Sequence, residues 1–118
     1  MAGKKNLTIS QGSTFRYKFK VNKMETGSET PVDLTGCVAR MQIRPTQRSD
    51  TLFLDLHADG YITIDDPLTG SITIDIPSSV TTDLSFSKAV YDIQIDFPDG
   101  YVMRLIEGSI FLSPEVTR

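Results

Sequence analysis

The sequence has few of the residues on which enzyme and metal sites depend. Its 118 residues include one Cys, one His and no Trp. A lone Cys37 cannot form an internal disulfide, which fits folding in a reducing cytoplasm. One Cys and one His also fall short of a zinc site and leave a nucleophilic triad without its parts. We therefore expect no catalytic residues and no cofactor.

Basic charge and long apolar runs are also scarce. Twelve Lys and Arg stand against 15 Asp and Glu, which gives a net charge of −3. A nucleic-acid-binding domain usually carries a basic surface, so no nucleic-acid partner is expected. No stretch approaches the ~18 apolar residues of a membrane span, and no signal-peptide core is present, so no membrane partner is expected.

The pattern that is present has a period of two. In residues 15–21 apolar side chains alternate with Arg and Lys, and in residues 91–97 they alternate with Asp and Gln. Such alternation is typical of strands with one buried face. With short strands and frequent turn signals, it predicts an all-β, immunoglobulin-like antiparallel β-sandwich of about eight strands. A small barrel is the structural alternative.

We expect one domain over residues 1–118, with a flexible N-terminus (1–5) and a C-terminal tail (113–118). Strands are predicted at 6–10, 14–22, 37–44, 51–57, 61–65, 71–76, 89–97 and 101–112. The polar segment 23–31 is expected to be an exposed loop, and 77–86 to hold a helical turn. The last strand is apolar on both faces, with Gly108 marking a bulge that exchanges them.

The expected core comprises the inward positions of these strands. Its members are Phe15, Tyr17, Phe19, Met41, Leu54, Ile74, Tyr91, Ile93 and Ile95.

Candidate chemistry is sparse in these elements. His57 is expected at a strand end and Cys37 at an inward position, where it packs as a small apolar residue. Four turn carboxylates could gather around Ca²⁺: Asp59, Asp65, Asp66 and Asp99. Asp is also an ordinary turn residue and the EF-hand spacing is absent, so no metal site is expected.

Charge on the outward faces suggests an interaction surface. Arg16, Lys18 and Lys20 lie on one strand, whereas Asp92 and Asp96 lie on another that the fold places in the opposite sheet. These are either two solvated faces or two faces of opposite sign that meet between subunits in a head-to-tail ring. The candidate interface residues are Arg16, Lys18, Lys20, Asp92, Asp96, Tyr101, Phe111, Glu115 and Arg118.

Five short motifs occur in order along the chain: QGSTF at 11–15, PVDLTG at 31–36, ARMQIRP at 39–45, RLIEG at 104–108 and SPEVTR at 113–118. Together they resemble a family of small tailed-bacteriophage virion proteins, similar to the immunoglobulin-like N-terminal domain of phage baseplate upper proteins. The similarity covers nearly the whole chain.

The resemblance implies a non-enzymatic structural protein of the virion, assembled in the bacterial host cytoplasm. It would be a multi-copy neck or collar, head–tail connection, tail or baseplate subunit. Its partners would be other virion proteins, in a homo-oligomeric ring or in several copies on a larger ring. Because this chain ends at Arg118 without a fibre-linking region, we expect a stand-alone collar, adaptor or decoration subunit. The alternatives are a capsid decoration protein and a carbohydrate- or receptor-binding module, which would need exposed aromatic platforms.

Overall fold

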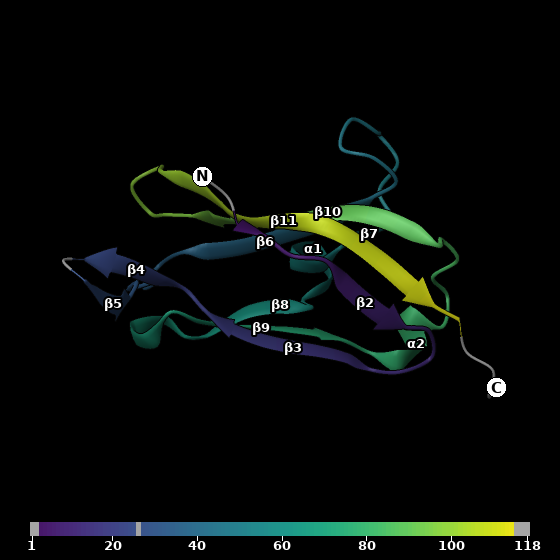
Figure 1. Ribbon diagram of the computed structural model, residues 1–118, viewed down its shortest axis with the longest axis horizontal. Helices are drawn as coiled ribbons and strands as arrows, with labels where there is room; N and C mark the ends of the chain where they lie inside the picture. Colours follow the sequence, from purple (N-terminus) through teal and green to yellow (C-terminus); the bar gives the residue numbers. More distant parts are fainter. Residues whose placement is uncertain (1–2, 26, 115–118) are drawn as a thin grey trace.

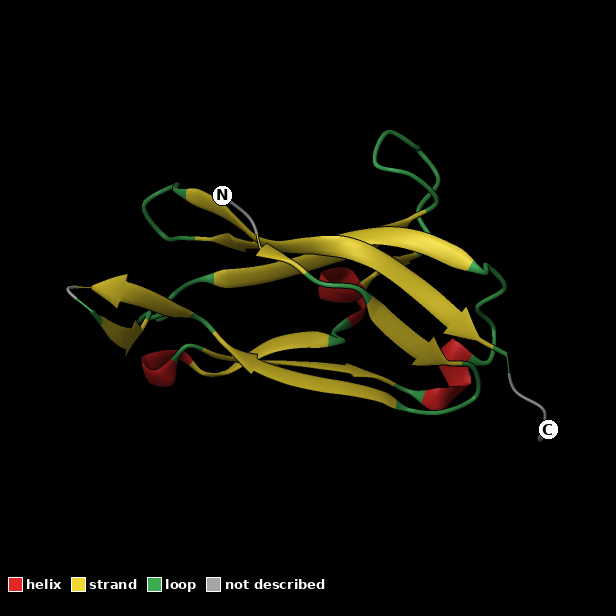
Figure 2. Ribbon diagram, viewed as in Figure 1, coloured by secondary structure: helices red, strands yellow, loops and turns green. Residues whose placement is uncertain are grey.

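The computed structural model describes residues 3–25 and 27–114, which form two β-sheets facing each other and a separate two-stranded hairpin (Figures 1 and 2). One sheet has the order β1-β11-β10-β6-β7, with β2 also paired to β11, and the other has the order β3-β9-β8. The larger sheet contains β1 (Gly3–Lys4), β2 (Leu7–Ser10), β6 (Val38–Arg44), β7 (Leu54–Asp55), β10 (Lys88–Asp96) and β11 (Val102–Ser113). The second sheet contains β3 (Phe15–Lys20), β8 (Ile62–Asp66) and β9 (Ser71–Ile76).

This strand order is that of an immunoglobulin-like sandwich. Strands β3, β9 and β8 take the places of strands B, E and D, while β6, β10 and β11 take those of C, F and G. Among the described residues no ladder joins the two sheets, so the sandwich prediction is confirmed and the barrel alternative is wrong.

The core lies between the two central strands. Ile72, Ile74 and Ile76 of β9 are fully buried, and Ile93 and Ile95 of β10 are at most 1% exposed. Removal of this apolar surface from water is the main favourable contribution to the fold. Six of the nine predicted core residues are buried: Met41, Leu54, Ile74, Tyr91, Ile93 and Ile95.

The other three predicted core residues, Phe15, Tyr17 and Phe19, are only half-buried. They lie on the inner face of β3, which is an edge strand with β9 as its neighbour. An edge position leaves one flank of each ring without a covering strand. The alternation therefore predicts the inward face of β3 correctly, but it does not distinguish an edge strand from a central strand.

The predicted strand 51–57 is confirmed only at Leu54–Asp55 and is wrong on both sides of these two residues. Only Leu54–Asp55 pair with β6, and the chain then turns into α1 (Leu56–Asp59), which lies between the sheets (Figure 1). The Asp55 carboxylate caps this helix by accepting from the Ala58 amide at 3.1 Å. Gly60 closes the helix in the left-handed conformation, with φ of 77°. The helical turn predicted in 77–86 is confirmed as α2 (Ser78–Thr81).

The polar segment 23–31 is not an irregular loop. It contributes to a two-stranded hairpin of β4 (Asn22–Glu25) and β5 (Ser28–Pro31), whose turn includes Gly27 with φ of 78°. The hairpin extends from one end of the sandwich (Figure 1), and the molecule measures 49 × 29 × 27 Å. The residues of the hairpin show no apolar alternation, so the sequence pattern does not predict its strands.

The face exchange in β11 occurs at Leu105, not at Gly108. Ile93 pairs with Ile106 and the next residue, Gln94, pairs with Arg104, so Leu105 is the extra residue of a bulge. Because of the shift, Met103 and Ile106 both pack against the core. The predicted apolar outer face of this strand is therefore reduced to a few exposed side chains.

Residues 3–5 are not a free extension. β1 and β2 run parallel to β11 in one register, with Gly3 opposite Ile106 and Leu7 opposite Ile110. This parallel pairing departs from the fully antiparallel prediction. Residues 1–2 and 115–118 lie outside the described residues, so most of the predicted tail does too.

Gly108 permits this pairing. A Cβ at Gly108 would overlap the Lys5 carbonyl, which accepts a hydrogen bond from the Tyr91 hydroxyl at 2.7 Å. The neighbouring Ser109 amide donates to the Asn6 side chain at 3.1 Å. A glycine is thus required by the close approach of two backbones.

Gly108→Ala should lower the free energy of unfolding by about 1–3 kcal/mol, because β1–β2 must move away from β11. Chemical denaturation measures the change, and amide exchange of Leu7 and Ile9 should become faster. Gly3→Ala is the matched control, since a Cβ at Gly3 would meet the Leu105 carbonyl at an ordinary 3.7 Å. Equal effects of the two substitutions would contradict this account.

Ile93→Ala should destabilise the protein by ~2–5 kcal/mol through lost burial and a cavity. Val102, which is 55% exposed on β11, supplies the control. Val102→Ala should change the denaturant midpoint little, and a similarly small change for Ile93→Ala would show that the inner face is misassigned.

Candidate functional site

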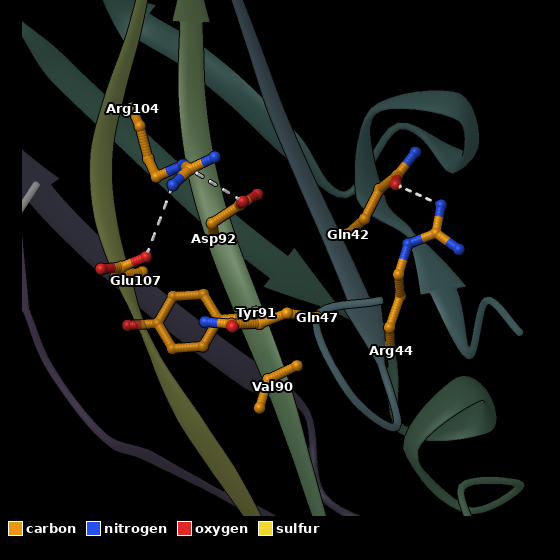
Figure 3. Close-up of a pocket in the computed structure, with 8 residues that line it drawn as sticks. All are labelled: Gln42, Arg44, Gln47, Val90, Tyr91, Asp92, Arg104 and Glu107. Carbon is orange, nitrogen blue, oxygen red and sulfur yellow. Dashed lines mark hydrogen bonds and ion pairs between the residues drawn. The ribbon is translucent and has the colours of Figure 1, made fainter. Parts of the chain in front are cut away.

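A polar groove lies on the outer face of the larger sheet (Figure 3). Its volume is about 260 Å³, and it is lined by residues of β6, β10, β11 and the loop after β6. The lining residues are Gln42, Arg44, Gln47, Val90, Tyr91, Asp92, Arg104 and Glu107. A second hollow of about 180 Å³ shares Gln42 and Asp92 with it and extends to Arg40 and Gln94.

The register of three strands builds this site. Asp92 lies opposite Gln42 of β6 on one side and Glu107 of β11 on the other. Outward residues of neighbouring strands stand side by side, so their polar ends meet over the sheet. The sequence shows the alternation in each strand, but the strand order is needed to bring Gln42, Arg44, Arg104 and Glu107 together. These residues were therefore missed as site candidates.

The charges in the groove balance one another. Arg104 lies 3.5 Å from Asp92 and 3.8 Å from Glu107, and these contacts converge in Figure 3. The Arg44 guanidinium donates to the side-chain oxygen Oε1 of Gln42 at 2.8 Å, and the side-chain Nε2 of Gln42 donates to the Asp55 carboxylate at 3.1 Å. The hydrogen bond from the Ala58 amide, followed by that from Gln42, keeps the pKa of Asp55 below its usual value. Such a network presents hydrogen-bonding groups to a polar partner.

The predicted separation of charge between the two outer faces is wrong. Arg16 pairs with Asp75 at 3.1 Å and Lys18 with Asp65 at 3.0 Å, on the outer face of the smaller sheet. The hydrogen bond from Lys18 lowers the pKa of Asp65. Lys20 is exposed and has no ion pair among the described residues.

The carboxylates of the other face are paired in the same way. Asp96 accepts from Arg40 at 2.7 Å, and Asp92 lies beside Arg104. On the larger sheet both counter-ions come from an adjacent strand. On the smaller sheet Arg16 pairs with the adjacent β9, whereas Lys18 reaches across β9 to β8. Such pairs can be recognised only when the strand order is known.

Of the remaining interface candidates, two are exposed in the structure and two lie outside the described residues. Tyr101 is 60% exposed and lies against Phe97, with ring centroids 5.4 Å apart. Phe111 is 40% exposed, with the Lys88 ammonium 5.8 Å from its ring centre. Glu115 and Arg118 lie outside the described residues. A role of these residues in an interface stays a prediction.

The residues considered for chemistry do not converge. His57 is exposed in α1, and Cys37 is half-buried before β6, where burial and then the charges of Asp33 and Asp99 raise the pKa of its thiol. In the described part of the chain, no three His, Cys, Asp or Glu residues are close enough to hold a metal ion. The four turn carboxylates, Asp59, Asp65, Asp66 and Asp99, therefore do not form such a group there.

No helix within residues 3–25 and 27–114 has the length and apolar character of a membrane span.

Comparison with known proteins supports the fold. No family model and no curated protein sequence matches the chain. The crystal structure of CopC from Methylosinus trichosporium OB3b is similar over 96% of this chain and 88% of CopC, with a TM-score of 0.51 and 11% identity. Murine CRIg is similar over 93% of this chain and 92% of its own, with a TM-score of 0.41 and 10% identity. At this identity, the CopC match bears on the immunoglobulin-like fold alone.

Tyr91, beneath the groove, gives this region a measurable titration. Burial, followed by the charge of Tyr17, raises the pKa of Tyr91 to about 12 from 10.0. The neutral phenol therefore stabilises the fold below pH 10, and this contribution is lost as the pH rises towards 12. Ultraviolet titration of the parent protein minus that of Tyr91→Phe should isolate this phenol. A difference curve centred at the ordinary tyrosine pKa would contradict its burial.

Proposed function

We propose that this chain is a non-enzymatic structural subunit of a tailed-phage virion that acts by assembling with other protein chains. The β4–β5 hairpin is the observation that carries the proposal. It extends from the sandwich and makes extensive contact with no other strand or helix of the described chain (Figure 1). A two-stranded hairpin alone in water is at best marginally stable. A neighbouring protein that packs against the hairpin would stabilise it.

The exposed apolar side chains support the same proposal. Leu68 is 71% exposed, and Tyr101 and Val102 near the β10–β11 turn are 60% and 55% exposed. The motifs at 11–15, 31–36, 39–45 and 104–108 add the resemblance to phage virion proteins, which indicates the kind of assembly. The expected role is that of a multi-copy neck, collar, head–tail, tail or baseplate subunit.

A test follows from the hairpin. Deleting residues 23–30 and joining Asn22 to Pro31 through two glycines should leave the sandwich folded and remove most of the protein from purified phage particles. Quantitative mass spectrometry of gradient-purified particles gives the copy number, and the thermal midpoint of the isolated variant checks folding. The register already places Asn22 opposite Pro31, so the short link preserves their pairing.

The experiment tests the virion role and the role of the β4–β5 hairpin separately. Absence of the parent protein from the particles would overturn the virion proposal. A folded deletion variant that enters particles at the parent copy number would overturn the role of the hairpin.

The groove favours one other candidate, glycan binding, because its amide, guanidinium and carboxylate groups match the hydrogen-bonding groups of sugars. A glycan array with the parent protein and Arg104→Ala distinguishes the two. Binding that Arg104→Ala abolishes would favour a receptor-binding module over a purely structural subunit.

A further inference from the structure

One edge of the smaller sheet continues into the hairpin as a single long strand. β3 pairs with β9 over Phe15–Lys20, and β4 pairs with β5 over Asn22–Glu25. Val21 joins them, donating from its amide to the Gly70 carbonyl at 2.8 Å and accepting from the Val32 amide at 2.9 Å. All these partners lie on one side of residues 15–25. In the described residues, no strand pairs with the other side.

The register shows which backbone groups face the open side. Both hydrogen-bonding groups of Val21 point toward the paired side. In an antiparallel ladder these directions alternate from residue to residue, so Phe15, Tyr17 and Phe19 also bond to β9. The residues that turn their amides and carbonyls to the open side are Arg16, Lys18, Lys20 and Asn22.

The β8–β9 ladder supports this assignment independently. The Asp75 amide donates to the Tyr61 carbonyl at 2.8 Å, toward β8. The backbone of Asp75 therefore points away from β3, and its partner Arg16 is not bonded to it through the main chain.

The side chains along this edge form two rows. On the inner side, Phe15, Tyr17 and Phe19 are half-buried, and the rings of Tyr17 and Phe19 stack with centroids 5.7 Å apart. A strand added to the edge would cover their open flank. On the outer side, the side chains of Arg16 and Lys18 remain 69% and 61% exposed despite their ion pairs.

The outer row excludes a second copy of the same edge. Pairing two such edges would set Lys and Arg residues opposite Lys and Arg residues, and like charges at facing positions are destabilising. Edge lysines commonly prevent such self-association. A strand with acidic side chains at these positions would instead meet Lys20, which has no ion pair among the described residues, and the exposed ends of Arg16 and Lys18.

We propose that the β3–β4 edge binds an extended segment of another protein in which apolar and acidic residues alternate. The segment joins the sheet as an added strand, with its apolar side chains over Phe15, Tyr17 and Phe19 and its carboxylates beside Arg16, Lys18 and Lys20. This inference goes beyond the proposed function, because it holds for any partner with such a segment.

The probe is a capped nine-residue peptide of alternating valine and glutamate, labelled at one end. The matched control replaces every glutamate with lysine. Fluorescence anisotropy should show at least roughly tenfold tighter binding of the glutamate peptide, with affinity that falls as salt is raised. Equal binding of the two peptides, or no binding of either at millimolar peptide, would overturn the proposal.

Lys18 supplies the sharpest variant. Its amide faces the open side, so Lys18→Pro removes a donor and obstructs strand addition without breaking the ladder to β9. Lys18→Gln removes the charge but keeps the amide. The proline variant should lose at least roughly tenfold more affinity than the glutamine variant. A folded proline variant that binds as tightly as the glutamine variant would show that no strand is added here.

Amide hydrogen exchange tests the site without any substitution, so a misfolded proline variant leaves the test intact. Saturating peptide should slow exchange at Arg16, Lys18, Lys20 and Asn22 by at least roughly tenfold and change Tyr17 and Phe19 little. Unchanged exchange at all four residues would overturn the proposal. These experiments need only purified protein and peptide, so their failure is distinguishable from absence of the chain from phage particles.

Discussion

The structure depends on the contact between two aliphatic strand faces. β9 and β10 are the central strands of their sheets, and each presents a row of isoleucines to the other sheet. Each central strand has a neighbour on both sides, so its position determines where β3, β8, β6 and β11 lie. Burying this aliphatic surface stabilises the fold, while the outer faces are left to polar side chains. The groove lies on the outer face of the larger sheet, and the unpaired edge of β3 belongs to the smaller sheet.

Much of the fold follows from local pattern, and the exceptions have identifiable causes. Period-two alternation predicts the strands and most of the core, because burial on one sheet face is a local property of the sequence. It does not predict the hairpin at Asn22–Pro31, whose backbone pairing needs no apolar period. Nor does it predict α1, where the Asp55 cap and Gly60 change a strand-like run into a helical turn.

The candidate site could be predicted less well than the fold. Arg16, Lys18, Asp92 and Asp96 are identifiable as outward charges from their own strands. Their counter-ions come from other strands, in two cases far away along the chain: Asp75 is 59 residues from Arg16, and Arg40 is 56 residues from Asp96. Strand order and register must be known before such pairs can be recognised. The same limit applies to the groove, which three strands form together.

The pairing of the first strands with β11 has a consequence for biosynthesis. Leu7 and Ile110 are partners separated by more than a hundred residues, and β10 also lies between β6 and β11. A nascent chain emerging from the ribosome can form the β8–β9 ladder early, because those contacts are local. β1 and β2 have no partner until β11 has been translated. The larger sheet is therefore completed late, through contacts between residues far apart in sequence. Until then the N-terminal strands are exposed to chaperones.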